Sequence, residues 1–245
     1  MWVKCLLSNL WKFYLLFLVI ITLLLFYPIY FFLLNNEKYF SAGFKLIRFQ
    51  AKVILLLAGI RPIVEGIIPD DENTTYIICP NHSSYLDILL LYYCLPHYFI
   101  FLGKQELQNI PIFNIFFKKM NILVNRGNPK AAYEAIKKAC EQIGKGNNIV
   151  IFPEGTIPPS APKMKPFKNG AFKVAQDLGI SIIPISFRDN YRLLEDSMKI
   201  NAKSTYGKAR VYVHPPILAE EHSKMDLVSL REKTKAIIAS KLEID

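Results

Sequence analysis

The hydrophobic and polar positions divide the chain at about residue 60. From Phe13 to Leu34 no residue is charged, a run of 22 positions, and a helix that crosses a bilayer needs about 20 such residues. The next segment, Ala42–Ile60, has basic residues in its first half and aliphatic residues in its second, which is typical of a helix at the headgroup boundary. We therefore expect residues 1–60 to anchor the protein in a membrane. Either one transmembrane span or a two-helix hairpin inserted into one leaflet fits this pattern, and the hairpin is favoured.

After residue 60, short apolar runs alternate with segments of helical periodicity. The apolar runs predict strands at Tyr76–Cys79, Tyr98–Leu102, Ile122–Val124, Asn148–Phe152, Ile182–Phe187 and Ala209–Val213. The periodic segments predict helices at Leu86–Cys94, Pro129–Ile143, Gly170–Leu178 and Asp226–Lys241. This alternation predicts an α/β domain over residues 61–245, with a mostly parallel sheet flanked by helices. In such sheets ligands bind at the carboxyl ends of the strands.

The composition is both apolar and basic, which narrows the choice of partners. The 245 residues are 52% hydrophobic and carry a net charge of +10, which is too apolar for a disordered chain. No nucleic-acid-binding module is recognisable, so we expect no nucleic acid as a partner. The four cysteines are widely spaced and match neither a disulfide framework nor a structural zinc site. They predict free thiols in a reducing compartment.

The first candidate for chemistry is His82, in the turn that follows the Tyr76–Cys79 strand. A neutral imidazole can accept a proton near neutral pH. Asp87 lies near the first turn of the next helix, where its carboxylate can orient the ring as the aspartate of a triad does. No nucleophile motif such as G-x-S-x-G accompanies the pair, so the base would activate a hydroxyl of the substrate itself. The alternative is a capping box of Ser84 and Asp87 that only steadies the helix start.

The second candidate is the turn Pro153–Thr156, which follows the Asn148–Phe152 strand. Gly155 allows backbone N–H groups to approach an anion closely, and Thr156 adds a hydroxyl donor. Glu154 would orient a nearby basic side chain or accept a hydrogen bond from a substrate hydroxyl. The alternative is an ordinary strand-to-loop turn.

Basic residues supply a third element. Residues 101–170 hold 11 of the Lys and Arg residues and 4 acids, so most of the net charge lies in this stretch. Lys104 and Arg126 each follow a predicted strand, and Lys168 lies in the loop after the Pro153–Thr156 turn. All three are on the carboxyl side of strands, where basic side chains can bind phosphate oxygens.

Together these motifs resemble the 1-acylglycerol-3-phosphate acyltransferase family of glycerolipid synthesis. The likeness covers most of residues 60–215, and its blocks occur in the family's order. They are Asn81–Asp87 (N-H-x-S-x-x-D), Lys104–Leu107 (K-x-E-L), the strand ending in Arg126, Phe152–Thr156 (F-P-E-G-T), Phe167–Gly170 (F-K-x-G) and Ile183–Ile185 (V-P-I).

The resemblance implies that His82 deprotonates the free hydroxyl of a lysophospholipid, which then attacks the thioester of acyl-CoA or acyl-carrier protein. The expected acceptor is 1-acylglycerol-3-phosphate, which gives phosphatidic acid. Asp87 would orient His82. The remaining residues would bind substrate, mainly the acceptor's phosphate: Arg126, Glu154, Gly155, Thr156, Lys104 and Lys168. The resemblance also implies that no cofactor or metal is needed, and that the enzyme is a membrane protein with its catalytic domain in the cytoplasm.

Two positions depart from the family's pattern. Met120 stands where the block ending in Arg126 usually has Gly, and Ile157 follows Thr156 where Arg is common. Loss of that Arg removes one potential phosphate ligand. Another lysophospholipid or a lyso-aminolipid therefore remains an alternative acceptor. A non-catalytic membrane lipid-binding protein with the same fold is the alternative of another class.

Overall fold

The structure is a computed structural model that describes residues 2–69, 71, 73–125, 127–195 and 202–242. Its helices are α1 (Trp2–Leu33), η1 (Glu37–Tyr39), α2 (Phe40–Leu57), α3 (Leu86–Cys94), η2 (Gln105–Asn109), α4 (Asn114–Lys119), α5 (Pro129–Gly144), α6 (Gly170–Leu178), α7 (Asn190–Leu193), α8 (Ala219–His222) and α9 (Leu227–Ala239). Its strands are β1 (Ile60–Gly66), β2 (Ile77–Pro80), β3 (Phe99–Lys104), β4 (Ile122–Val124), β5 (Asn148–Val150), β6 (Ile182–Phe187) and β7 (Gly207–Val213).

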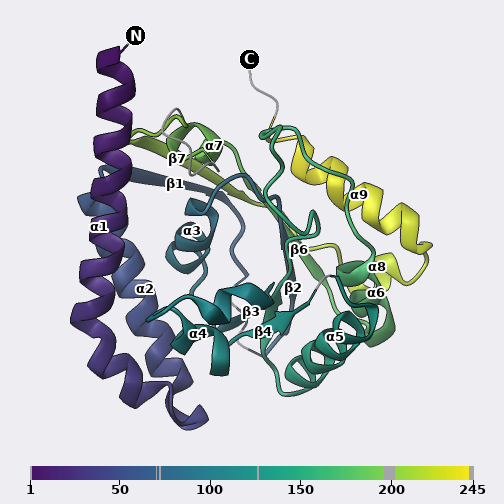
Figure 1. The fold of residues 1–245 in the computed structure, drawn as a ribbon. Coiled ribbons are helices and arrows are strands. Elements are labelled where there is room, and N and C mark those ends of the chain that lie inside the picture. Colours follow the sequence, from purple (N-terminus) through teal and green to yellow (C-terminus); the bar gives the residue numbers. More distant parts are fainter. Residues whose placement is uncertain (1, 70, 72, 126, 196–201, 243–245) are drawn as a thin grey trace.

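The described strands form one sheet in the order β1-β7-β6-β2-β5-β3-β4 (Figure 1). Neighbouring strands run parallel in every pair except β6 and β7. The predicted fold class, a mostly parallel sheet flanked by helices, is therefore confirmed. Strands β6, β2 and β5 lie side by side in the middle of the sheet, so the loops that follow them leave the same edge.

The strands and helices that were predicted after residue 60 have the observed bounds to within two residues. Strand β1 was not predicted, because the prediction continued the second helix to Ile60, whereas α2 ends at Leu57 and Ile60 begins β1. The short helices α4, α7 and α8 were not predicted either. β1 contains Arg61, Pro62 and Glu65 and pairs only with β7. An edge strand of this kind is half-exposed, so it lacks the apolar run that marks the buried strands.

Alternating side chains of the central strands fill two separate cores. Ile78 of β2 and Val150 of β5 face a layer made by α1, α2, α3 and α4. Ile77 and Ile149, each one position earlier, face α5, α6 and α9. Because successive side chains of a strand point to opposite faces, both faces of the sheet are covered by helices.

α1 and α2 form a helical hairpin, joined by the short segment around η1 (Figure 1). A row of buried hydrogen bonds connects the helices. The Tyr30 hydroxyl donates to Gln50 Oε1 at 2.6 Å, and Gln50 Nε2 donates to Thr22 Oγ1 at 2.9 Å. Buried polar groups need partners, so this row favours one register between the two helices.

The hairpin is also part of the domain's core. Phe44 and Ile54 of α2 are buried in the same cluster as the sheet residues Ile78 and Val150. The predicted boundary at residue 60 coincides with the start of β1, but the segments on either side of it share apolar packing. The division into an anchor and a catalytic domain stays a prediction.

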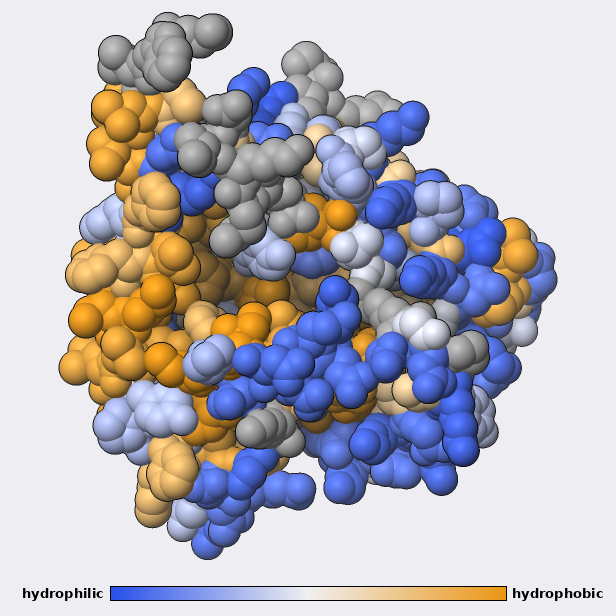
Figure 2. Space-filling view, in the orientation of Figure 1, coloured by the Kyte–Doolittle hydropathy of each residue, from blue (hydrophilic) through white to orange (hydrophobic). Residues whose placement is uncertain are grey.

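One face of α1 is apolar and uncovered. Among the described helices, α1 alone is long and apolar enough to cross a membrane, over Cys5–Leu33. Its exposed side chains include Phe13, Phe17 and Leu25, and the last of these is 70% exposed. Figure 2 shows hydrophobic side chains gathered along the side formed by α1, whereas hydrophilic ones cover most of the opposite side.

At the other end of the chain, a buried serine and histidine hold α9 on the sheet. The Nε2 atom of His214 lies 2.8 Å from Ser186 Oγ, and Ser186 Oγ donates to the carbonyl oxygen of Ile238 in α9 at 2.8 Å. Burial lowers the pKa of His214 to about 4, and the positive charge of Lys241 acts in the same direction. The folded protein therefore keeps His214 neutral.

This histidine predicts a loss of stability in mild acid. An unfolded histidine titrates near 6.5, so below that pH the unfolded chain binds a proton that the folded chain does not accept until about pH 4. The contribution of His214 to the free energy of unfolding is thus fully present above pH 6.5 and is lost as the pH falls toward 4. We expect His214→Gln to flatten the pH dependence of thermal unfolding in this range, as measured by circular dichroism. Equal slopes for the variant and the wild type would contradict this prediction.

Candidate active site

His82 lies in the loop between β2 and α3, and the side chain of Asn81 fixes the start of this loop. Asn81 is buried, its Oδ1 accepts the backbone N–H of Phe187 at 2.7 Å, and its Nδ2 donates to the carbonyl oxygen of Phe187 at 3.2 Å. The side chain thus continues the pairing between β2 and β6 beyond Pro80. His82 is therefore held at the carboxyl end of a central strand, as the sequence predicted.

Asp87 bonds the ring of His82. Its Oδ2 atom lies 2.9 Å from His82 Nδ1 and also accepts the backbone N–H groups of Ser83 at 2.7 Å and Ser84 at 3.0 Å. A carboxylate oxygen that already accepts two N–H donors acts as an acceptor for the ring too, so Nδ1 carries the hydrogen. The other ring nitrogen, Nε2, then has a free lone pair, and none of the described residues bonds to it.

The capping alternative is realised in part. Leu86 N–H donates to Ser84 Oγ at 3.2 Å, and Asp87 accepts the N–H of Ser84 at 3.0 Å. In a full capping box the serine hydroxyl would accept the N–H of Asp87, which here donates to the carbonyl oxygen of Ser84 at 3.2 Å. The sequence posed orientation of His82 and steadying of the helix start as alternatives. In the structure one carboxylate does both.

The Phe152–Thr156 turn supports His82 from β5, the strand next to β2. The ring of Phe152 stacks on the imidazole with centroids 4.0 Å apart and planes 23° apart. Glu154 is buried, and its Oε1 accepts the backbone N–H of His82 at 2.8 Å while its Oε2 accepts that of Lys165 at 2.8 Å. Burial raises the pKa of Glu154, and these two hydrogen bonds oppose the shift. Glu154 therefore connects the His82 loop to the loop that contains Lys165, and we call this pair of hydrogen bonds the clamp.

These contacts differ from the binding role that the sequence suggested for Glu154. Neither oxygen of its carboxylate is bonded to a basic side chain among the described residues, and both bond backbone N–H groups. Gly155 has a φ of 77°, and its own N–H donates within the turn to the carbonyl oxygen of Phe152 at 3.0 Å. Thr156 is exposed beside this turn. Substrate binding by these three residues stays a prediction.

Lys168 lies over the turn. Its Nζ is 3.2 Å from the position that a Cβ on Gly155 would occupy, and its backbone N–H donates to the carbonyl oxygen of Pro153 at 2.8 Å. A side chain at position 155 would therefore displace the lysine as well as strain the backbone. Lys168 is exposed, so its ammonium group is available to an anion at this edge of the sheet.

Lys104 and Arg126 are less directly placed. Lys104 ends β3, is 57% exposed and forms an ion pair with Glu106 at 3.2 Å. Arg126 lies outside the described residues. The two positions that depart from the family pattern, Met120 and Ile157, are both buried and fill apolar space.

Sequence reasoning missed Asn190, which follows β6 on the other side of β2. Its Nδ2 atom donates to Asp87 Oδ1 at 2.6 Å. A usable signal was present, since Asp189 and Asn190 follow a fully buried strand and so belong to the edge where polar groups gather. The Asn190–Asp87 contact joins residues 103 positions apart, and no local motif marks it.

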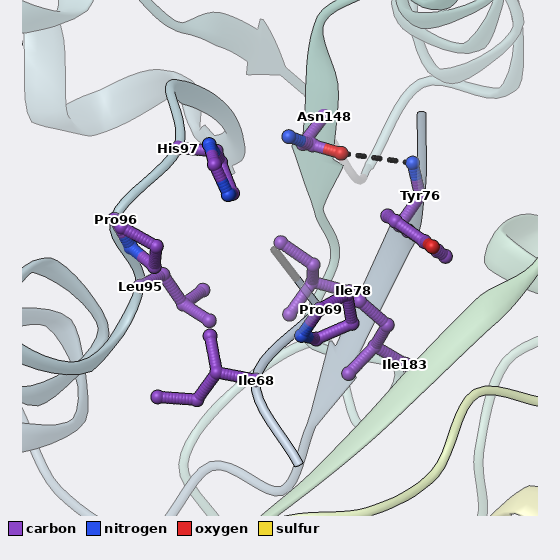
Figure 3. Close-up of a pocket in the computed structure, with 9 residues that line it drawn as sticks. All are labelled: Ile68, Pro69, Tyr76, Ile78, Leu95, Pro96, His97, Asn148 and Ile183. Atoms are coloured by element: carbon purple, nitrogen blue, oxygen red, sulfur yellow. Dashed lines mark hydrogen bonds between the residues drawn. The ribbon is translucent and has the colours of Figure 1, made fainter. Parts of the chain in front are cut away.

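Two other features of the structure lie away from this edge. A small apolar pocket includes Tyr76, His97 and Asn148, and lies at the amino-terminal ends of β2 and β5, opposite to His82 (Figure 3). Among the described residues no cluster of three or more His, Cys, Asp or Glu side chains is placed to hold a metal ion. The four cysteines are free thiols, and Cys79 and Cys94 are buried.

The clamp formed by Glu154 predicts a local effect of substitution. Glu154→Gln keeps the size of the side chain but turns an amide N–H₂ toward one of the two backbone N–H groups. We expect the N–H of His82 or Lys165 to exchange faster with solvent. The free energy of unfolding of the whole protein should change little, because the lost hydrogen bond is offset by removal of the cost of burying a charge. Hydrogen exchange followed by mass spectrometry measures this, with the exposed Glu134→Gln as control. Unchanged exchange in both loops would contradict the clamp.

Comparison with known proteins identifies the family of the chain. The family model described as Acyltransferase matches residues 61–188. A 1-acyl-sn-glycerol-3-phosphate acyltransferase of Borreliella burgdorferi is 32% identical over 203 residues, which are 82% of this chain and 79% of that protein. The chloroplast 1-acyl-sn-glycerol-3-phosphate acyltransferase BAT2 of Brassica napus is 28% identical over 70% of this chain, which spans about half (48%) of that protein.

A solved structure shows the same fold over almost the whole chain. The crystal structure of the 1-acyl-sn-glycerophosphate acyltransferase PlsC from Thermotoga maritima superposes with a TM-score of 0.81 at 23% sequence identity, and the match covers 98% of this chain and 96% of that one. The chain therefore belongs to the acyltransferase family, together with the 1-acyl-sn-glycerol-3-phosphate acyltransferases, and it is an acyltransferase of this type.

Proposed function

We propose that the protein transfers a fatty acyl group from an acyl thioester, acyl-CoA or acyl-carrier protein, to the free hydroxyl of 1-acylglycerol-3-phosphate, with His82 as general base. The observation that carries this proposal is the pair formed by Asp87 and His82 at the carboxyl end of β2. The pair leaves Nε2 as a proton acceptor, and no serine or cysteine nucleophile is needed. The names of the relatives support the choice of acceptor.

The proposed reaction is a direct transfer. Nε2 of His82 takes the proton of the acceptor hydroxyl while the hydroxyl oxygen attacks the thioester carbon. The tetrahedral intermediate that forms carries its negative charge on the former carbonyl oxygen. The carbon–sulfur bond then breaks, and the departing thiolate receives the proton from the imidazolium. The ester product and the free thiol account for all atoms, and the base returns to its neutral form. We propose that the thioester donor is the sole co-substrate and that no further cofactor takes part.

The acceptor's phosphate needs cationic groups near this pair. We propose Lys168, Lys104 and Arg126 for this role, and we propose the Glu154–Thr156 turn as a further contact of the acceptor. Lys168 is the best supported of these, because its ammonium group is exposed beside Gly155 while Glu154 ties the same turn to His82. Ile157 is buried where relatives commonly have Arg, so a different lysophospholipid or a lyso-aminolipid is the second candidate for the acceptor.

The attachment of α1 favours a hairpin in one leaflet over a transmembrane span. Near the start of α1, the backbone N–H of Ser204 donates to Ser8 Oγ at 2.7 Å. Just beyond its end, Lys119 Nζ of α4 donates to Asn35 Oδ1 at 2.6 Å. A 32-residue helix is about 48 Å long, and both ends of α1 are thus bound to the same domain. We propose that the apolar face of α1 enters the cytoplasmic leaflet while the catalytic domain stays in the cytoplasm, where acyl thioesters are available.

The catalytic proposal predicts a large effect of His82→Ala. Loss of a general base lowers turnover by about 100-fold to 10,000-fold, and the lysolipid should still bind. The measurement is acyl transfer in detergent with acyl-CoA or acyl-carrier protein and a panel of lysolipids. His97→Ala, at the opposite end of the strands, is the matched control and should retain activity.

Two results would overturn the catalytic proposal. Near-normal transfer by His82→Ala would show that this histidine is not the base. Lysolipid binding without turnover, equal in wild type and variant, would instead favour a non-catalytic lipid-binding protein. Preference for another lysolipid in the panel would change the acceptor and leave the mechanism in place.

The membrane proposal predicts the effect of charges on α1. The triple variant Phe13→Lys, Phe17→Lys and Leu25→Lys places ammonium groups on its apolar face, where each removed side chain is at least 58% exposed. Because burying a charge in the bilayer is costly, we expect much weaker co-flotation with phosphatidylcholine–phosphatidylglycerol vesicles. The control is Tyr133→Lys, Leu218→Lys and Val228→Lys, three exposed apolar positions on α5, before α8 and on α9. Equal flotation of both triple variants would contradict the proposal.

A further inference from the structure

Asn190 forms a hydrogen bond with Asp87 of the proposed catalytic pair and comes from the segment that follows β6. It begins α7, three residues after the end of β6, and its side chain is fully buried. Its Nδ2 atom donates to Asp87 Oδ1 at 2.6 Å. β6 pairs with β2. Asn190, which follows β6, therefore lies next to the loop that follows β2 and contains His82.

The two oxygens of Asp87 have different partners. Oδ2 accepts His82 Nδ1 and the backbone N–H groups of Ser83 and Ser84. For Oδ1, the described residues provide Asn190 at 2.6 Å and the hydroxyl of Ser83 at 3.5 Å, which is at the limit for a hydrogen bond. Asn190 is therefore the strong donor that holds Oδ1 and so fixes the plane of the carboxylate. That plane decides whether Oδ2 points at the imidazole.

The orientation of the Asn190 amide follows from the same contact. An ionised carboxylate can only accept, so the amide nitrogen must face Asp87. The amide oxygen then points elsewhere, and it is buried without a hydrogen-bond partner among the described residues. Leaving a buried acceptor unpaired costs stability. At this position an apolar residue would avoid the cost of the unpaired oxygen but would lose the hydrogen bond to Asp87. The presence of asparagine therefore indicates that this hydrogen bond has a role in holding Asp87.

Neighbouring contacts keep Asn190 in place. Asp189 forms a two-pronged ion pair with Arg210, at 2.8 Å for both Nε and Nη2. On the other side of Asn190, Ser84 Oγ of the His82 loop donates to the carbonyl oxygen of Leu194 at 2.7 Å. The segment around α7 is thus pinned both to β7 and to the loop whose geometry it influences.

We propose that Asn190 is a positioning residue for acyl transfer, which fixes the Asp87 carboxylate so that Asp87 in turn orients His82. The proposal rests on the proposed function, in which His82 is the general base. Without the Asn190 donor, Oδ1 lacks its strong hydrogen bond, so the carboxylate can rotate toward another donor. The imidazole of His82 would then no longer be held in one orientation. Among the described residues, the hydrogen bond of the Asn190 side chain goes to Asp87 and those of Glu154 go to the backbone of His82 and Lys165, so the substitution should leave the Phe152–Thr156 turn in place.

The test is Asn190→Leu, which keeps the approximate volume and removes both the donor and the unpaired oxygen. We expect kcat in the folded fraction to fall by about tenfold to a hundredfold and KM for the lysolipid to change by less than about twofold. The thermal midpoint should also fall, because Oδ1 of the buried carboxylate loses its donor. The matched control is Asn148→Leu, at the opposite end of the strands. Asn148 accepts the backbone N–H of Tyr76 (Figure 3) and donates to the carbonyl oxygen of Tyr98. This variant should therefore lose stability while its kcat in the folded fraction stays normal.

A second variant covers the case in which Asn190→Leu fails to fold. Asn190→Asp has the same shape, but its carboxyl can donate a hydrogen bond to Asp87 only while it holds a proton. Two carboxylates this close repel each other, which raises the pKa at which that proton is lost. We expect its kcat to decline on the alkaline side at a pH where the wild type is still fully active. A purely structural asparagine would leave the pH profile unchanged.

The outcomes separate this inference from the proposed function. Inactive His82→Ala together with wild-type kcat and an unaltered pH profile in the Asn190 variants would overturn the positioning role alone. Active His82→Ala would overturn the proposed function. A kcat loss shared equally by Asn190→Leu and Asn148→Leu would show that the effect is one of general stability, and would also overturn the positioning role.

Discussion

The geometry of the site depends on one buried carboxylate. Asp87 is completely shielded from solvent, and an ionised carboxylate in such a place needs hydrogen bonds to every face it presents. Its partners are two backbone N–H groups of the loop before α3, the ring of His82 and the amide of Asn190. The need to satisfy this charge therefore shapes the loop, caps the helix and orients the histidine at once. The geometry of the proposed catalytic pair and the local folding have the same cause.

The apolar hairpin of α1 and α2 is joined to this site through shared packing. α2 lies between α1 and the rest of the domain, and its buried residues belong to the core that also contains Leu86, Leu90 and Leu91 of α3. α3 is the helix that carries Asp87. The apolar and the basic character of the composition thus come from two different parts of one folded domain. The apolar excess lies largely on α1, and the basic residues of the central stretch include Lys104 and Lys168 near the carboxyl edge of the sheet.

The sequence predicted most of the fold because local patterns determine most of it. Buried strands such as β6 are largely apolar runs. α3 starts after a polar turn and ends shortly before Pro96, and α6 starts after Asn169 and ends before Gly179, so their predicted limits are those of the structure. β1 was missed because an edge strand with Arg61, Pro62 and Glu65 has no such run. In the site, the pairing of His82 with Asp87 spans five residues and was predicted from one helix turn. The contacts of Glu154 and Asn190 cross 72 and 103 positions of the chain, and only the order of strands in the sheet brings them together.

The most direct test concerns the hydrogen on the ring of His82. If Asp87 holds Nδ1–H, nitrogen NMR of ¹⁵N-histidine-labelled protein, with the His82 signals assigned by their absence in His82→Ala, should show a protonated Nδ1 and an unprotonated Nε2 in the neutral ring. Nε2 would then be free to take the proton of the acceptor hydroxyl. A neutral His82 protonated at Nε2 would have no lone pair facing the substrate, and would contradict its role as the base.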